Sequence, residues 1–451
     1  MKRSLYVLFA ILLVDQLDAG MMMPILPQLL TDAESEVLLI DPARTEGLGA
    51  LLVALLGAAY ALPAFFAQPL LGQLADRHGR KPLLIASFAS SAASFFPFAW
   101  GATSGSVALL IVARVVDGIA AGNLLVAQAA VGDVTDEDSR TRYFGYFTAS
   151  LSLGFVIGPL AGGYLGDPEL ASWTGPAAAF LVAGGLNVAA LAGFALLFRE
   201  TLADEERDGD DDDFTLARGF HNAREAFADG KRRPYYLILL CYIGGYTFFT
   251  TFYAVVLEER LDMDATDSGY FFSALGLALM LVQLFVVDRV ERWAGSRKTL
   301  WLALFGVAAA MATLALARAP WLAYAAIVPF ALGAGLVDPL IMSLLSRSAS
   351  GREQGRIQGV RGSVDSLGRA VPPFLAGPLA AAGAANWAVL AGAGAMALGG
   401  ALSLRLLAGD PERDDDGEDG EDGDAEAVPR RITHAGPEVG APDGQADAVA
   451  T

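Results

Sequence analysis

Charged side chains interrupt the apolar segments of this sequence, and the first pair has a spacing that suits proton transfer. Asp15 and Asp18 lie three residues apart, so both carboxyls fall on one face of a helix. Removing a carboxylate from water favours its neutral form, so such an acid can take up and release a proton. Two neighbouring acids titrate as a coupled pair. We expect Asp15 to carry the proton, with Asp18 as second candidate; alternatively, one of them is a structural cap or counter-ion.

A second polar group lies in the apolar segment 106–132. Arg114, Asp117 and Gln128 follow helical spacing and would line one face of a helix. An arginine at the middle of a membrane costs on the order of 3 kcal/mol unless it faces a cavity or a charged partner. This cost predicts that Arg114 faces a cavity; a plain ion pair with Asp117 near the end of the helix is the alternative.

A third group forms a charged stripe in the apolar segment 355–382. Arg361, Asp365 and Arg369 recur every four residues, and Asp338 precedes Pro339 in the segment before. Asp365 can neutralise both arginines. An unpaired arginine here would favour an anionic substrate, whereas the acids of the first segment would favour a cationic one, and the sequence leaves both open.

The elements that must position these residues are membrane-spanning helices. The chain of 451 residues is 54% hydrophobic, with a mean hydropathy of +0.45. Apolar segments of about 20 residues recur, each long enough to cross a bilayer as a helix, because backbone polar groups in lipid must bond internally. About twelve spans are predicted, at 4–30, 47–73, 82–102, 106–132, 142–166, 174–198, 235–257, 267–288, 298–317, 321–346, 355–382 and 386–407.

A polar turn at 72–82 separates two long apolar segments and is the candidate gate. Its glycine and charged positions are Gly72, Asp76, Arg77, Gly79, Arg80 and Lys81. Short basic loops stay on the cytoplasmic side of a membrane, and the other basic loops fall on the same side as this one, so both termini are predicted to be cytoplasmic. Asp76 can accept hydrogen bonds from helix-terminal N–H groups or from Arg142 and hold the inward face shut. Lys81 is expected to serve as an orientation signal.

The segment 142–166 carries a glycine motif. Gly154, Gly158 and Gly162 lie four residues apart on one helix face, which lets another helix approach closely. Pro159 lacks a backbone donor, so it frees a carbonyl and bends the helix, and Gly163 completes the motif. Plain helix packing is the alternative role.

The sequence also contains an internal repeat. Seven residues of the segment 142–163 recur 214 residues later: Arg142, Gly145, Ser152, Leu153, Gly154, Pro159 and Gly163 correspond to Arg356, Gly359, Ser366, Leu367, Gly368, Pro373 and Gly377. Tandem halves with a central site at their interface are the arrangement that alternating access requires.

Together, these motifs resemble signatures of the major facilitator superfamily. The turn at 72–81 reads Gly-x-Leu-Ala-Asp-Arg-x-Gly-Arg-Lys and resembles the loop between its second and third helices. Arg114-x-x-x-Gly118 resembles the fourth-helix signature of proton-coupled exporters, and 154–163 resembles the fifth-helix signature of exporters. Asp15 followed by Met-Pro-x-Leu-Pro resembles the tetracycline/proton antiporter group, in which Gly is expected where Asp18 stands.

This resemblance implies a fold and several roles. The fold would be an all-α integral membrane protein with two six-helix, pseudo-symmetric bundles. Arg114 would assist proton exchange, and Asp76 and Asp133 would belong to a charge relay that governs the conformational switch.

The charge distribution suggests the domain boundaries. The formal net charge is −19, and the acid is concentrated outside the apolar segments. We expect a first bundle at 1–198, an acidic then basic cytoplasmic linker at 199–234, a second bundle at 235–407, and an acidic disordered cytoplasmic tail at 408–451. The acidic, lysine-poor composition predicts a halophilic prokaryote as the source; a merely acidic linker and tail is the alternative.

The sequence therefore predicts a secondary transporter of the cell membrane that exports small amphipathic compounds by proton antiport. The alternatives are a proton- or sodium-coupled importer on the same fold and a non-transporting sensor or scaffold. We expect no enzymatic activity, no cofactor, no metal ion and no nucleic-acid partner, and a monomer. ATP is not expected to drive transport, because no Gly-x-x-x-x-Gly-Lys-Ser/Thr sequence occurs.

Overall fold

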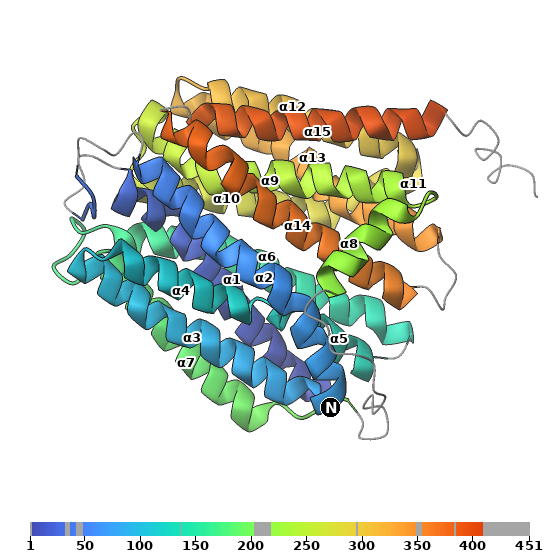
Figure 1. Cartoon of the computed structure of the whole chain (residues 1–451), viewed down its shortest axis with the longest axis horizontal. Helices are drawn as coiled ribbons and strands as arrows, with labels where there is room; N and C mark the ends of the chain where they lie inside the picture. Colours follow the sequence, from blue (N-terminus) through green and yellow to red (C-terminus); the bar gives the residue numbers. More distant parts are fainter. Residues whose placement is uncertain are drawn as a thin grey trace, which may run out of the picture. The chain divides into compact units, whose positions relative to one another are not determined.

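The structure is a computed structural model whose regular secondary structure, in the part of the chain it describes, is entirely helical (Figure 1). The described ranges are 2–31, 37–41, 48–135, 137–202, 218–294, 296–348, 354–382 and 385–408. The predicted linker lies outside them at 203–217, and the predicted tail lies outside them from 409 onward. All the helices belong to one unit of the chain, Met1–Gly409.

The helices follow the predicted apolar segments closely. The first half of the unit contains α1 (Lys2–Leu30), α2 (Ala50–His78), α3 (Arg80–Ser104), α4 (Val107–Ala120), α5 (Asn123–Val134), α6 (Glu137–Gly166) and α7 (Pro176–Leu197). The second half contains α8 (Arg218–Ala228), α9 (Arg233–Leu261), α10 (Ala265–Phe285), α11 (Val287–Ala294), α12 (Ser296–Leu316), α13 (Pro320–Arg347), α14 (Gln354–Ala381) and α15 (Ala385–Ala408).

Eleven spans among the described residues are long and apolar enough to cross a membrane, α4 and α5 together forming one of them. The twelfth predicted span is α14, which has 28 residues. Its length suffices, but the charged residues Arg361, Asp365 and Arg369 make it less apolar than the eleven other spans. The protein is an all-α integral membrane protein, as predicted.

The fourth span is broken rather than continuous. α4 ends at Ala120 and α5 begins at Asn123, with a turn at Ala121 and Gly122 between them. The N–H of Ala121 donates to the Gly118 carbonyl at 3.3 Å, an i to i−3 bond that tightens the last turn. Helical spacing therefore does not carry from Arg114 and Asp117 across to Gln128, which lies on α5.

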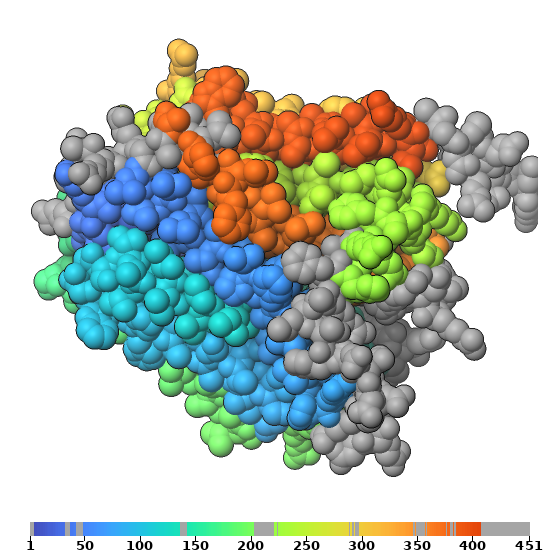
Figure 2. Space-filling view, viewed as in Figure 1, coloured from blue at the N-terminus to red at the C-terminus, as the bar shows by residue number. Residues whose placement is uncertain are grey.

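Two symmetry-related contacts join the halves, and we call them seams. In the α6–α10 seam, the fifth span of the first half packs against the second span of the second half; in the α14–α2 seam, the same elements exchange halves. α2 and α14 lie side by side in Figure 1, and their surfaces meet in Figure 2. Gly163 faces Ala265 of α10 and its repeat equivalent Gly377 faces Ala54 of α2. The internal repeat thus occupies equivalent positions in the two seams.

The glycine motif of α6 packs against α1. A Cβ added at Gly154, Gly158 or Gly162 would lie within 3.0 Å of backbone atoms of α1, closer than real Cβ atoms approach. On the neighbouring face, the backbone carbonyl of Pro159 lies against Gly269 of α10. Lipid provides no hydrophobic drive for helices to associate, so this close backbone approach supplies the packing energy.

α9 separates the core of the second half from the space between the halves. Phe249, Phe252 and Tyr253 are fully buried, and Phe249 packs on Phe330 of α13 with ring centroids 4.6 Å apart. Thr247, Thr250 and Thr251 line the interface between the halves instead. One side of α9 is therefore part of the core, and the other is available to the site.

Candidate functional site

The two acids of α1 lie in the first half, each beside an asparagine. Asn123 Nδ2 donates to Asp15 Oδ1 at 2.7 Å. Asn187 of α7 donates to Asp18, whose exposed fraction is 4%. The amide donors show how helices α5 and α7 stabilise these carboxyls away from water.

A third acid joins them from α4. Ser91 Oγ donates to Asp117 Oδ1 at 3.0 Å, and Arg114 Nη1 lies 3.4 Å from Asp117 Oδ2. Asp117 is close enough to interact electrostatically with both Asp15 and Asp18. We call Asp15, Asp18 and Asp117 the acid cluster; Arg114 is the cation bound to it in the described part of the chain.

Arg114 also lines a cavity between the halves. The cavity has a volume of about 200 Å³. It is lined by Ala19, Met22, Met23, Leu26 and Pro27 of α1, Val53, Gly57, Tyr60 and Ala61 of α2, Arg114 of α4, Thr247, Thr250, Thr251 and Ala254 of α9, and Arg369 and Pro373 of α14. The acids of α1 are not among these lining residues, whereas Arg114 both lines the cavity and contacts Asp117 of the acid cluster.

The two arginines of the charged stripe on α14 pair with different carboxylates. Asp365 accepts two hydrogen bonds from Arg369, at 2.8 Å from Nε and 3.3 Å from Nη2. Arg361 instead forms an ion pair with Asp338 of α13, at 2.5 Å. Asp365 therefore pairs with Arg369 rather than with both arginines, and Arg369 is the member of the stripe that reaches the cavity.

The predicted gate residues form a second charged cluster at the α2–α3 loop. Arg80 bonds to Asp76 at 2.5 Å and to Asp133 of α5 at 3.1 Å. Arg142, which sequence reasoning considered as a partner of Asp76, donates to Tyr146 at 2.9 Å. The relay residues Asp76 and Asp133 are thus connected through Arg80.

Glu200, just after α7, holds this loop in place. Its carboxylate accepts the N–H groups of Arg80 at 2.8 Å and Lys81 at 3.0 Å, besides those of Thr201 and Leu202. Partial burial alone would raise the pKa of Glu200, but these four N–H donors outweigh it and hold the pKa below its usual value. Gly79 has φ of 97°, and a Cβ there would overlap the carboxyl of Glu200. Only glycine fits this turn.

The halves touch at the end of the unit opposite this loop. Thr31 Oγ1 donates to Glu258 at 2.7 Å, and the hydroxyls of Tyr164 and Tyr270 are hydrogen-bonded. At the α2–α3 loop end, a Cβ added at Gly72, Gly145 or Gly362 would meet no described atom outside its own helix within 4 Å. The described residues of the two halves thus bond at the end opposite this loop, and Ser152 of α6 also donates to Gln283 near the other end of α10.

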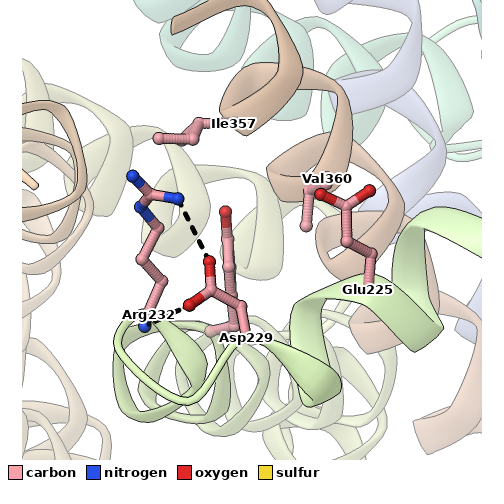
Figure 3. Close-up of a pocket in the computed structure, with 6 residues that line it drawn as sticks. Glu225, Asp229, Arg232, Ile357 and Val360 are labelled. Atoms are coloured by element: carbon pink, nitrogen blue, oxygen red, sulfur yellow. Dashed lines mark hydrogen bonds and ion pairs between the residues drawn. The ribbon is translucent and has the colours of Figure 1, made fainter. Parts of the chain in front are cut away.

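A small cleft lies where α8 meets α9 and α14, and Figure 3 shows Arg232 paired with Asp229 in it. Arg232 bonds to Asp229 at 3.1 Å and to the backbone carbonyl of Ser348 at 2.9 Å. Burial would raise the pKa of Asp229, but the N–H groups and guanidinium of Arg232 and the N–H of Lys231 lower it. Ile357 and Val360 of α14 line the opposite side. This junction is a structural anchor of α8.

Sequence reasoning missed several residues of the site. Asn123 and Asn187 bond to the acids, and Asn187 is the one strongly polar side chain in the apolar α7, which is a usable signal. Asn123 directly follows the glycine at which the fourth span breaks. Glu200 gave no local signal, because its partners lie about 120 residues away in the chain.

The fold and the central cavity define a multi-pass membrane transporter of the alternating-access type. The sequence model of the Major Facilitator Superfamily matches residues 8–373 and 290–439. The chain therefore belongs to this superfamily.

Relatives across the superfamily agree with this membership. The chain is 30% identical to the class C tetracycline resistance protein of Escherichia coli over 86% of this chain and 93% of that protein. It is 29% identical to the class G tetracycline resistance protein of Vibrio anguillarum, over 87% and 95%. The crystal structure of the human organic anion transporter MFSD10 superposes with a TM-score of 0.68 at 22% identity, over 89% of this chain and 99% of that one. The protein is thus a membrane-embedded transporter of small molecules, and its relatives are transporters rather than enzymes.

Proposed function

We propose that this transporter exports small amphipathic compounds in exchange for protons. The observation that carries the proposal is that the acid cluster contacts, through Asp117, the Arg114 side chain that lines the central cavity. Arg114 contacts the acid cluster and lines the cavity. A change of charge in the cluster therefore changes the electrostatic potential at the cavity. The relatives named tetracycline resistance proteins support efflux as the direction.

Transport would follow from mutual exclusion between proton and substrate. Each would favour a different facing state, so each moves only when the other has left. Asp15 is the first candidate for the proton carrier, Asp18 the second, and Asp117 is the acid that links them to Arg114. The basic loops favour an orientation with both termini and the α2–α3 loop in the cytoplasm.

The test is substrate-triggered proton movement in liposomes that contain the full chain. A pH dye inside reports flux under an imposed pH gradient, and a panel of amphipathic cations, anions and sugars is added. Asp15→Asn is the test variant, and Asp262→Asn is the matched control, because Asp262 caps α9 on the surface in a left-handed conformation that Asn also adopts.

We expect flux in the wild type and in Asp262→Asn, and its loss in Asp15→Asn. Coupling retained in Asp15→Asn but lost in Asp18→Asn or Asp117→Asn would move the carrier to that acid. A response that requires sodium and ignores the pH gradient would overturn proton antiport in favour of a sodium-coupled importer. We also propose that the monomer is the functional unit, which flux from liposomes with at most one chain each would test.

A further inference from the structure

We propose that the central cavity binds the anionic head group of its substrate between Arg114 and Arg369, and that the substrate class is the amphipathic organic anion, such as an arylcarboxylate. The inference rests on the proposed function, because it takes the cavity as the substrate site. The two arginines come from opposite halves, on α4 and α14, so one ligand group would contact both halves at once.

The guanidinium of Arg114 has unused donors. Its Nη1 carries the contact with Asp117 at 3.4 Å and one with the sulfur of Met22 at 3.4 Å, a weak acceptor. Its Nε is buried and has no hydrogen-bond partner among the described residues. Nε and Nη2 together form the edge that grips a carboxylate with two parallel bonds. An anion that bonded to this edge would give the buried Nε a partner while Asp117 stays on Nη1.

Arg369 offers a complementary end. Asp365 occupies its Nε and Nη2, which leaves the Nη1 donors free of that pair. The side chain is 48% exposed although it lies in the middle of α14, and it lines the cavity. Both arginines line the cavity together with Tyr60. The Cζ of Arg114 is 5.1 Å from the centre of that ring.

The rest of the lining suits an anion with an apolar body. Of the described residues that line the cavity, none is acidic, and the hydroxyls come from Tyr60 and three threonines of α9. Met22, Met23 and Leu26 supply an apolar side. The acids that would attract a cation lie outside this lining. A cavity of about 200 Å³ is smaller than the roughly 300–1,000 Å³ that encloses a drug-sized ligand, so it fits a compact aromatic anion or the head group of a longer one.

The test compares two probes of matched shape and opposite charge, 2-naphthoate and 2-naphthylmethylammonium, by equilibrium dialysis against the purified full chain. We expect naphthoate to bind more tightly by about tenfold or more, since hydrogen bonds to charged groups contribute about 1.5–3 kcal/mol each. Arg114→Gln and Arg369→Gln should each lower naphthoate affinity by a similar factor. Arg114→Lys keeps the charge but loses the two-bond edge, so an intermediate affinity is expected. Arg405→Gln, at an exposed position in the last turn of α15, is the control.

Equal or tighter binding of the ammonium probe by the wild type would overturn the proposal, and that comparison needs no variant. Unchanged naphthoate affinity in both glutamine variants, at wild-type melting temperature, would overturn it as well. Proton-coupled flux of the ammonium probe that persists in both variants would sink the anion site and leave the proposed function standing. Naphthoate binding that depends on both arginines, with no proton flux for any compound, would support the anion site and overturn the proposed function.

Discussion

The two seams between the halves share a backbone plan but differ in their side chains. In each seam, a serine on the fifth span donates to a glutamine on the second span of the other half. The bonds are Ser152 to Gln283 at 3.3 Å and Ser366 to Gln68 at 2.5 Å. In each, a proline of the fifth span also lies against a glycine of that partner helix, Pro159 against Gly269 and Pro373 against Gly57. The repeat in the sequence therefore specifies the same contacts twice.

The difference between the seams lies in their charges. α14 carries Arg361, Asp365 and Arg369, and the equivalent positions of α6 are Phe147, Leu151 and Phe155. The cavity follows this difference, because α14 and α2 contribute lining residues and α6 and α10 contribute none among those described. The comparison teaches that the symmetric residues build the frame, while the departures from symmetry supply the chemistry.

The largest effect is expected from filling the tight contact of α6. In Gly158→Ala, the new Cβ would overlap the backbone of α1, so we expect destabilisation of about 1–3 kcal/mol or more. The matched control is Gly244→Ala on α9, which faces α14 with its nearest atoms at 3.9 Å. That variant should keep or slightly raise stability, because alanine is the better helix former. Melting of the purified chain in detergent measures both, and equal shifts would contradict the packing difference.

The second prediction makes α14 resemble α6. Asp365→Leu combined with Arg369→Phe inserts the residues of α6 at the equivalent positions. Replacing a paired charge by apolar residues is often neutral for stability, so the chain should fold and melt as before but lose transport. Asp365→Leu alone leaves Arg369 unpaired and should destabilise the folded chain. Breaking a fully buried pair costs about 3–5 kcal/mol, and the loss here should be smaller because Arg369 is 48% exposed. Full transport by the double variant would show that the charges of α14 are dispensable.

A smaller effect is expected from the two serine bonds. Ser366 is 3% exposed, and Ser366→Ala leaves Gln68 without its partner inside the α14–α2 seam. A loss of about 0.5–1.5 kcal/mol is expected there. Ser152→Ala in the α6–α10 seam should cost less, because that bond is longer and exposed to its surroundings. The melting temperatures of the two variants measure these losses. A larger loss in Ser152→Ala than in Ser366→Ala would contradict the prediction.

The smallest effect concerns pH at the α2–α3 loop end of the first half. The pKa of Glu200 lies below its ordinary value of 4.5, so its stabilisation is complete above about pH 4.5 and is lost as the pH falls through the folded-state pKa. Glu200→Gln should melt lower than wild type at neutral pH, and the two should converge in acid. Glu169→Gln, an exposed acid in the loop after α6, is the control. A difference that persists unchanged to pH 3 would exclude the carboxylate as the cause.

The sequence by itself determined the class of protein, the spans and the repeat. These follow from local properties, namely the length of apolar segments, the helical spacing of glycines and the composition of short loops. The motif at 72–81 and the glycines of α6 were therefore sufficient to predict the charged α2–α3 loop and the tight helix contact. The predicted domain boundaries at 198, 234 and 407 and the halophilic source remain predictions.

Only the tertiary structure decided how the charged residues divide among partners. Sequence spacing placed Arg361, Asp365 and Arg369 on one face of a helix, but the position of α13 gave Arg361 a different partner, Asp338. The break at Gly122 likewise separated Gln128 from Arg114. The packing of α1 against its neighbours, which no spacing encodes, placed its acids beside Asn123 and Asn187 rather than at the cavity. The physical reason is that a side chain's partner depends on the rotation and distance of neighbouring helices, which contacts far apart in the chain set.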